Sequence, residues 1–361
     1  MRLYNDQYSY FTACIVKMAD SNDSSNKMKE LVVEEKPKEK NWNNLPFEMK
    51  EMVVKEMDLE TRTCLKMCSK ADKYLVESIP MSIDKLRIWI ANRVVDLELS
   101  HEGFYRWIRI YAAESIVVIS NSPSEEEEDN VKEIQCSNNE EAKKLVKQIF
   151  ASIVFNKMIR FNYVDADIVG FPDIFDNSEF TMSTKKLDIV GSPSQVTEWL
   201  KNIAPGVEHV RIPMTEDTHG KLEGVGNIAA VVNAKELEID IENDINDEQL
   251  ANFKCTTLDI TGRSNITGKG INQLIKKAIS NDYPKGSNLR IHVFPNIFLQ
   301  TWNDIIDGLD VKVTDFQDDI DANGQVELRR RKGKIKMKDG KCMVVSASKH
   351  GRRLSTVVKV L

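Results

Sequence analysis

The sequence predicts a mixed α/β fold, and three of its features point to that class. A short pattern of the form apolar-x-x-apolar-x-apolar, as at 207–212, is typical of a strand whose alternate side chains are buried. Amphipathic stretches of helical period separate the copies of this pattern, and turn pairs between alternating residues mark the C-terminal tail. We therefore expect short helices at 41–80, alternating strands and helices at 81–320, and a β-meander at 321–361.

Residues 41–80 predict a compact run of three short helices. Asn44 or a neighbour can cap the first helix, and Pro46 suits its first turn, where a missing N–H costs nothing. Met49, Met52, Val53 and Met57 recur at three- and four-residue spacing, which predicts one apolar stripe along that helix. Cys64, Leu65 and Cys68 repeat the spacing on a second helix, and Ser69 can cap a third. So small a unit buries little surface and needs a partner or a neighbouring domain.

At these residues the chain resembles the F-box of the large nematode F-box families. The likeness rests on the Leu45-Pro46 opening, on Glu48, on the apolar residues that follow, and on the run at 61–69. The resemblance implies docking on a Skp-type adaptor, which would join the chain to a cullin and a RING protein in an SCF ubiquitin ligase. Carried over to this sequence, the docking face would consist of Leu45, Pro46, Met49, Val53, Met57, Leu65 and Met67. The alternative is an ordinary helical hairpin that belongs to the core.

Residues 81–320 carry the recurring strand pattern, which begins at 83–88 and 94–99. Further copies lie at 187–190, 207–212, 234–239, 255–260 and 289–293. Their spacing of roughly 20 to 30 residues is the period of leucine-rich repeats, which stack into a curved solenoid with a parallel sheet. The asparagine of such repeats is absent, so we expect a degenerate, leucine-rich-repeat-like solenoid, or else a generic α/β domain of parallel strands. The region also resembles the FTH domain that follows the F-box in one nematode family, on the segment at 233–239 and the tract after it.

The tail at 321–361 predicts a basic β-hairpin or meander that caps the repeat array. Asp339-Gly340 between alternating segments is a strong hairpin signal, and we expect further turns at Lys332-Gly333 and His350-Gly351. Between 329 and 341 the sequence has eight lysine and arginine residues against one acid. These cations would be the solvated side of an edge strand, a nuclear import signal, or a site for acidic partners, RNA included.

Two further stretches have the composition of solvated segments. Residues 1–40 are polar and weakly patterned, which predicts a disordered arm, and Met18 is a second plausible start. An acidic loop is expected at 120–140, because the glutamates at 125–128 repel one another and stay solvated. Phosphorylation at Ser122 or Ser124, followed by capture of a basic partner, is the functional alternative for that loop.

The composition and the absence of catalytic motifs restrict the possible functions. A net charge of −6 argues against a chain whose partner is nucleic acid or an anionic membrane. Six cysteines without disulfide spacing favour reduced thiols and a cytoplasmic or nuclear protein, and no apolar run is long enough to cross a bilayer. The five histidines lack metal-binding spacing, and the glycine-rich segment at 262–270 departs from the phosphate-binding loop at its first glycine and its Ser/Thr position. We expect no enzyme activity, no cofactor and no metal.

The functional hypothesis combines these expectations. By resemblance, the chain would be the non-catalytic substrate receptor of an SCF-type ubiquitin ligase, with the repeat-like domain binding an unknown protein substrate. Outward strand positions that could contact it are Glu238, Asp240, Asp259, Arg290 and His292. The alternative is a protein-interaction scaffold independent of any ligase, or a corepressor of an RNA-binding protein.

Overall fold

The structure is a computed structural model, and the contacts within the chain divide it into two units at Met81 and Ser82. The expected arm at 1–40 and positions 123–131 of the expected acidic loop lie outside the described residues. The structure describes residues 42–57, 59–91, 94–101, 104–111, 116–122, 132–136, 138, 141, 144, 153–154, 159–169, 181–215, 220–281, 283–293, 298–320, 326–337, 340–350 and 353–361.

The first unit consists of short helices around a small apolar core. Its elements are the 3-10 turn η2 (Trp42–Asn44) and the helices α2 (Phe47–Lys55), α3 (Leu59–Cys68) and α4 (Lys70–Ser78). The Ser69 hydroxyl caps α4 by accepting a hydrogen bond from the Asp72 amide at 3.0 Å. The core contains Val54, Leu75, Val76 and Ile79, against which Trp42, Met57 and Leu65 pack.

A buried arginine joins the helix ends of this unit. The Arg62 guanidinium is almost fully buried and donates to the carbonyl oxygens of Ile79 at 2.8 Å, Met57 at 3.1 Å and Lys55 at 3.3 Å. Burial lowers the pKa of Arg62 from its usual value. Because carbonyls at a helix end lack partners within the helix, one guanidinium here satisfies acceptors at the end of α2 and after α4.

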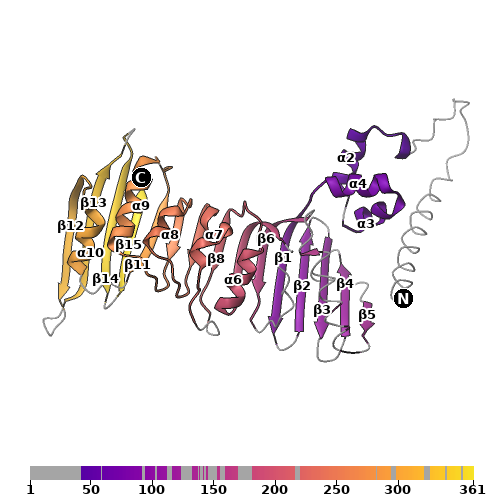
Figure 1. The fold of residues 1–361 in the computed structure, drawn as a ribbon, viewed down its shortest axis with the longest axis horizontal. Coiled ribbons are helices and arrows are strands. Elements are labelled where there is room, and N and C mark those ends of the chain that lie inside the picture. Colours follow the sequence, from indigo (N-terminus) through magenta and orange to yellow (C-terminus); the bar gives the residue numbers. More distant parts are fainter. Residues whose placement is uncertain are drawn as a thin grey trace, which may run out of the picture. The chain divides into compact units, whose positions relative to one another are not determined.

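The second unit is built on one sheet, with strands in the order β12-β13-β14-β15-β11-β10-β9-β8-β7-β6-β1-β2-β3-β4-β5 among the described residues (Figure 1). The strands at the N-terminal side are β1 (Met81–Ala91), β2 (Val94–His101), β3 (Phe104–Tyr111), β4 (Ile116–Ser122) and β5 (Lys132–Gln135). The central strands are β6 (Ile159–Asp167), β7 (Ser183–Val190), β8 (His209–Ile212), β9 (Glu236–Ile239), β10 (Thr257–Ile260) and β11 (Asn288–Val293). The C-terminal strands are β12 (Val311–Ile320), β13 (Val326–Lys336), β14 (Cys342–His350) and β15 (Arg353–Val360).

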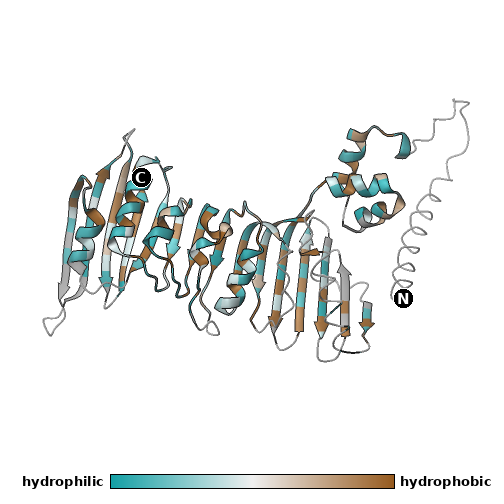
Figure 2. Ribbon diagram, viewed as in Figure 1, coloured by the Kyte–Doolittle hydropathy of each residue, from teal (hydrophilic) through white to brown (hydrophobic). Residues whose placement is uncertain are grey.

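The central strands β6 to β11 are parallel and in register, so equivalent residues form rows across the sheet. One such row is buried and consists of Val164, Leu187, Val210, Leu237, Leu258 and Leu289. Apolar and polar residues alternate along these strands (Figure 2), which gives the sheet one buried face and one face that the described helices leave open. We call the latter the open face.

Helices cover the buried face of the sheet (Figure 1). They are α6 (Pro193–Lys201), η3 (Val225–Asn227), α7 (Ala229–Asn233), α8 (Asp247–Asn252), α9 (Gly268–Ser280) and α10 (Phe298–Ile306). A capping box at Ser192 with proline at 193 starts α6. The alternation of strands and helices is confirmed from β7 to β11, where every strand pattern found in the sequence overlaps a strand.

The first two copies of the strand pattern do not belong to a repeat of strands and helices. They form β1 and β2, and β1 to β5 are an antiparallel meander. Only positions 92 and 93 lie between β1 and β2, which is enough for a hairpin and far too few for the crossover that parallel strands need. The expectation of strand–helix repeats from residue 81 onward is therefore wrong for this part of the sheet.

The tail forms an antiparallel meander, as predicted, but one of the three expected turns is wrong. Gly340 has φ +74° at the expected hairpin between β13 and β14. The turn expected at Lys332-Gly333 is wrong, because β13 continues through both residues. The sequence analysis also missed β12, which covers β13 and forms the edge of the sheet. The basic strand is therefore not the edge strand.

Candidate interaction surfaces

The first unit exposes apolar side chains on α2. Met49, Met52 and Val53 are 51 %, 66 % and 42 % exposed, whereas their neighbour Val54 is fully buried. Three- and four-residue spacing places the three exposed residues on one side of the helix, and Val54 faces the small core instead. We call Met49, Met52 and Val53 the apolar stripe. Contiguous exposed apolar side chains are common at surfaces where proteins interact.

The residues expected at the adaptor-docking face divide into two groups. Met49 and Val53 lie in the apolar stripe, and Pro46 and Met67 are also exposed. Leu45 is half-buried, while Met57 and Leu65 pack against the core of the helical unit. Met52, the most exposed member of the stripe, was not among the expected docking residues, although its spacing from Met49 indicates the same side of the helix.

The open face of the sheet carries a row of charged residues. Each occupies the position between two buried apolar residues of its strand, and parallel register makes these positions neighbours. The charges run in the order plus, minus, minus, repeated, and end on a plus. We call this set the charged row; from β1 through β6 to β11 it consists of Arg87, Asp165, Asp188, Arg211, Glu238, Asp259 and Arg290.

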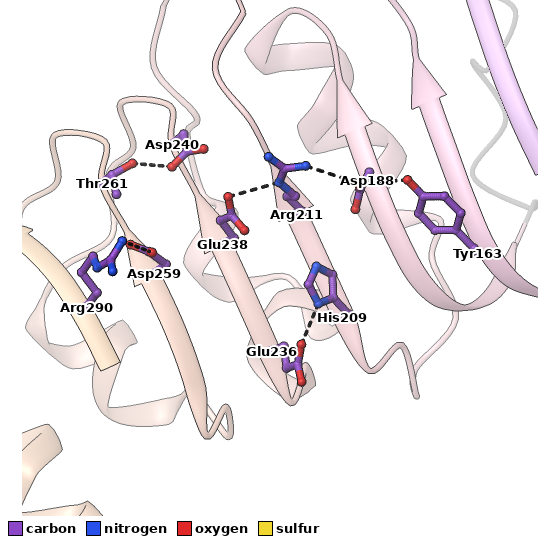
Figure 3. A network of polar contacts seen from close by, with 10 residues as sticks. All are labelled: Tyr163, Asp188, His209, Arg211, Glu236, Glu238, Asp240, Asp259, Thr261 and Arg290. Atoms are coloured by element: carbon purple, nitrogen blue, oxygen red, sulfur yellow. Dashed lines mark hydrogen bonds and ion pairs between the residues drawn. The ribbon is translucent and has the colours of Figure 1, made fainter. Parts of the chain in front are cut away.

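Each arginine of the charged row is paired with an acid on a neighbouring strand. Arg211 Nε lies 3.1 Å from Glu238 and its Nη1 3.7 Å from Asp188, and Arg290 lies 3.1 Å from Asp259 (Figure 3). Arg87 is likewise 3.1 Å from Glu98 and 3.4 Å from Asp165. The hydrogen bond to Glu238 raises the pKa of Arg211. The cations of the row are therefore neutralised within the protein.

Polar contacts hold one acid of the charged row, Asp188, and two acids beside the row, Glu236 and Asp240, in place. The Tyr163 hydroxyl donates to Asp188 at 3.0 Å, and burial together with that carboxylate raises the pKa of Tyr163 to about 12. Thr261 donates to Asp240, and His209 Nδ1 lies 2.9 Å from Glu236 (Figure 3). The middle of the open face is thus a preorganised polar surface with more acids than bases.

Asp259 keeps one carboxylate oxygen without a hydrogen bond among the described residues. Burial raises the pKa of its carboxyl, and Arg290 offsets that effect in part. Its second oxygen, Oδ1, is buried and has no hydrogen-bond partner in the described part of the chain. A buried acceptor without a donor is costly, so this oxygen is a local source of instability in the charged row.

The outward positions expected from the sequence are mostly placed on the open face. Glu238, Asp240, Asp259 and Arg290 lie there, but His292 is only 9 % exposed. The sequence analysis missed Asp188 and Arg211. Both occupy the same position of the strand pattern as Glu238, so the repeat itself could have identified them.

The open face continues onto the antiparallel strands β1 to β3. The almost fully buried Asp96 accepts two hydrogen bonds from Arg109, at 2.6 and 3.0 Å, and that guanidinium lies 4.2 Å from the ring centre of Trp107. The pair with Asp96 raises the pKa of Arg109. Trp89 is 43 % exposed on the same face. This end of the face therefore combines an aromatic surface with cations that are already neutralised.

The described residues do not form a metal centre, and no described helix is both long and apolar enough to cross a membrane. Cys64, Cys68, Cys136, Cys255 and Cys342 are free thiols. Burial raises the pKa of Cys255 to about 12, which keeps that thiol protonated and poorly nucleophilic. No family model, curated protein or solved structure matches this chain.

Proposed function

We propose that this chain is a non-catalytic receptor that brings a protein substrate to a cullin–RING ubiquitin ligase. The helices α2 to α4 act as an F-box-like module that docks on a Skp-type adaptor. In the second unit, strands β7 to β11 with their helices act as a degenerate, leucine-rich-repeat-like domain, similar to an FTH domain, that binds the substrate. Ubiquitin is then transferred by an enzyme bound elsewhere in the complex, because a tethered substrate is present at high local concentration.

The apolar stripe carries this proposal. A unit this small gains little stability by burying apolar residues, yet α2 leaves two methionines and a valine exposed on one side. Methionine is unbranched and polarisable, and it is common at helix faces that bind partners. The stripe therefore supports a docking role for α2, and it includes two residues of the face that the F-box resemblance implies.

The open face supports the second half of the proposal. Its middle is fixed by ion pairs and hydrogen bonds before any partner binds, so little side-chain ordering is needed on association. A row of paired charges contributes more to the specificity of binding than to its affinity, because only a partner with complementary charges fits it. This is the property expected of a receptor.

The test is binding of the full chain to a purified Skp-type adaptor by isothermal titration calorimetry. Met52→Lys should weaken binding by about tenfold or more, because apolar anchors at an interface typically contribute about 2 kcal/mol. Ala71→Lys is the matched control: it places the same charge at an exposed position of α4 outside the stripe, and binding should stay within about twofold. Met57→Lys is a poorer test, since Met57 packs against the core.

Two outcomes would contradict the adaptor proposal. One is a wild-type chain that does not bind the adaptor. The other is a loss of binding in Ala71→Lys as large as that in Met52→Lys, which would mean that added charge, and not the stripe, is responsible. The first result would leave a scaffold independent of the ligase as the better account, and the second would show that the apolar stripe does not form the docking face.

A further inference from the structure

The C-terminal end of the open face carries a group of exposed cations. Register places Lys332 beside Ser346, Ser346 beside Val357, and Val357 beside Arg290, so these residues share the face of the charged row. Other cations on this face follow from the same pairing. We call this set the basic strip; it consists of Lys312 on β12, Arg330, Lys332, Lys334 and Lys336 on β13, and Lys359 on β15.

The basic strip differs from the charged row because its charges are not neutralised. All six side chains are exposed, and none of them forms an ion pair with another described residue. Asp315, which stands opposite Lys332, is the one acid among the described side chains on this face of β12 to β15. Although the net charge of the chain is −6, the basic strip produces a local positive potential that attracts anions.

Protection of a sheet edge does not explain these cations. Lysines on an edge strand prevent pairing with other chains, and β12 is the edge strand here. Most of the basic strip lies on β13, which pairs with β12 on one side and β14 on the other, and Lys359 lies on β15, inside the sheet. Protection of the edge strand therefore does not account for the positive charge of these residues.

The strip has the dimensions of an extended peptide. Lys332, Lys334 and Lys336 alternate along β13, so they lie about 7 Å apart, as do alternate side chains of any extended chain. Beside them on β14 the open-face residues are small and uncharged: Val344 faces Lys334, and Ser346 faces Lys332. Lys359 borders Val344 on the far side. A chain lying along β14 would thus have cations on both sides.

We propose that the basic strip binds an extended protein segment in which acidic residues alternate with small ones. An acidic peptide is favoured over single-stranded nucleic acid for two reasons. The described open-face side chains of β12 to β15 include no aromatic residue on which bases could stack. The neighbouring strands also present Asp259 and Glu238, which would repel a polyanion that continues across the face. This inference rests on the proposed function, since it names the chemical class of substrate.

The test measures fluorescence anisotropy of labelled probes with the full chain. The probe is a short peptide in which glutamate and serine alternate; a peptide of alternating lysine and serine and a uridine oligonucleotide of equal negative charge serve as comparisons. The wild type should bind the acidic peptide about tenfold or more tightly than either comparison, and the affinity should fall as ionic strength rises.

Charge reversal locates the site. The variant Lys332→Glu/Lys334→Glu/Lys336→Glu should lose about tenfold or more in affinity for the acidic peptide. A matched variant, Lys221→Glu/Lys254→Glu/Lys285→Glu, changes the net charge equally at exposed loop positions and should stay within about twofold. Equal losses in the two variants, tighter binding of the oligonucleotide, or no preference for the acidic peptide would each overturn the inference.

The outcome is separable from that of the adaptor experiment. Met52→Lys should bind the acidic peptide as the wild type does, because it alters only the helical unit. Adaptor binding without peptide binding would leave the proposed function standing and remove the inference about the substrate. Peptide binding without adaptor binding would do the reverse.

Discussion

His292 is a nearly buried residue at the C-terminal side of the charged row. The ring is 9 % exposed, its Nδ1 lies 3.3 Å from the Thr261 carbonyl oxygen, and it contacts the Arg353 guanidinium. Arg353 also donates to the Thr261 carbonyl at 3.0 Å. Burial and the charge of Arg353 lower the pKa of His292, with Arg290 acting in the same direction and Asp240 against it. The folded protein therefore holds this histidine neutral.

A lowered histidine pKa makes stability depend on pH. Below the ordinary value of about 6.5 the unfolded chain takes up a proton at His292 that the folded chain refuses. Stability is thus fully present above pH 6.5 and is lost as the pH falls toward the lower pKa of the folded state. We expect the urea midpoint to fall between pH 7.5 and pH 5.5, and to fall less in His292→Gln. An equal fall in the two proteins would show that His292 is not the cause.

For single residues, the strand pattern could predict which side chains face outward, but it could not predict which side chains they contact. Asp188, Arg211 and Glu238 stand at one position of the strand pattern, and only the register of the parallel strands turns them into the charged row. The burial of His292 depends on Arg353, which lies 61 residues away in the chain. Sequence spacing carries no signal for such a contact.

Among the elements, β13 shows how one residue permits close packing. A Cβ built on Gly333 would collide with Cγ1 of Val311 on β12, so a side chain at this position of β13 has no room. The obstacle is a side chain and not backbone. Glycine inside a strand often marks such a close approach, although the sequence alone favoured a turn.

Gly333→Ala should therefore destabilise the pairing of β12 with β13 by about 1–3 kcal/mol through overpacking. Val311→Ala removes the obstructing methyl groups, so the double variant should lose less than the sum of the two single variants. Hydrogen exchange of the β12 to β14 amides measures all three. Additive losses would mean that the cost arises from the backbone of β13 and not from contact with Val311.

The elements differ in how far the sequence specifies them. Strands β7 to β11 follow a clear period of two residues and were predicted, and helices α6 and α9 lie in the amphipathic stretches expected between the strand patterns. β1 and β2 are antiparallel because the connection between them is short. The strand pattern that they share with the parallel strands does not indicate this relative direction. β12 was missed because polar residues, among them Asp315 and Gln317, interrupt its alternation.

For the whole molecule, the two units suggest a division of labour. The helical unit offers the apolar stripe, which is suited to a constant partner. The sheet unit offers a preorganised charged row and, next to it, the basic strip with unneutralised charge. Salt screens the charges of the basic strip but not the apolar contacts of the stripe. Rising ionic strength should therefore weaken binding of the acidic segment and leave adaptor binding almost unchanged.

The central claim is that one chain holds an adaptor and an acidic protein segment at the same time. A bridging assay tests it directly: immobilised Skp-type adaptor is incubated with the full chain and the labelled acidic peptide, and the captured label is measured. We predict capture only when the chain is present, with loss in Met52→Lys, loss in Lys332→Glu/Lys334→Glu/Lys336→Glu, and retention in Ala71→Lys. Capture that survives both of the first two changes, or no capture by the wild type, would contradict the account.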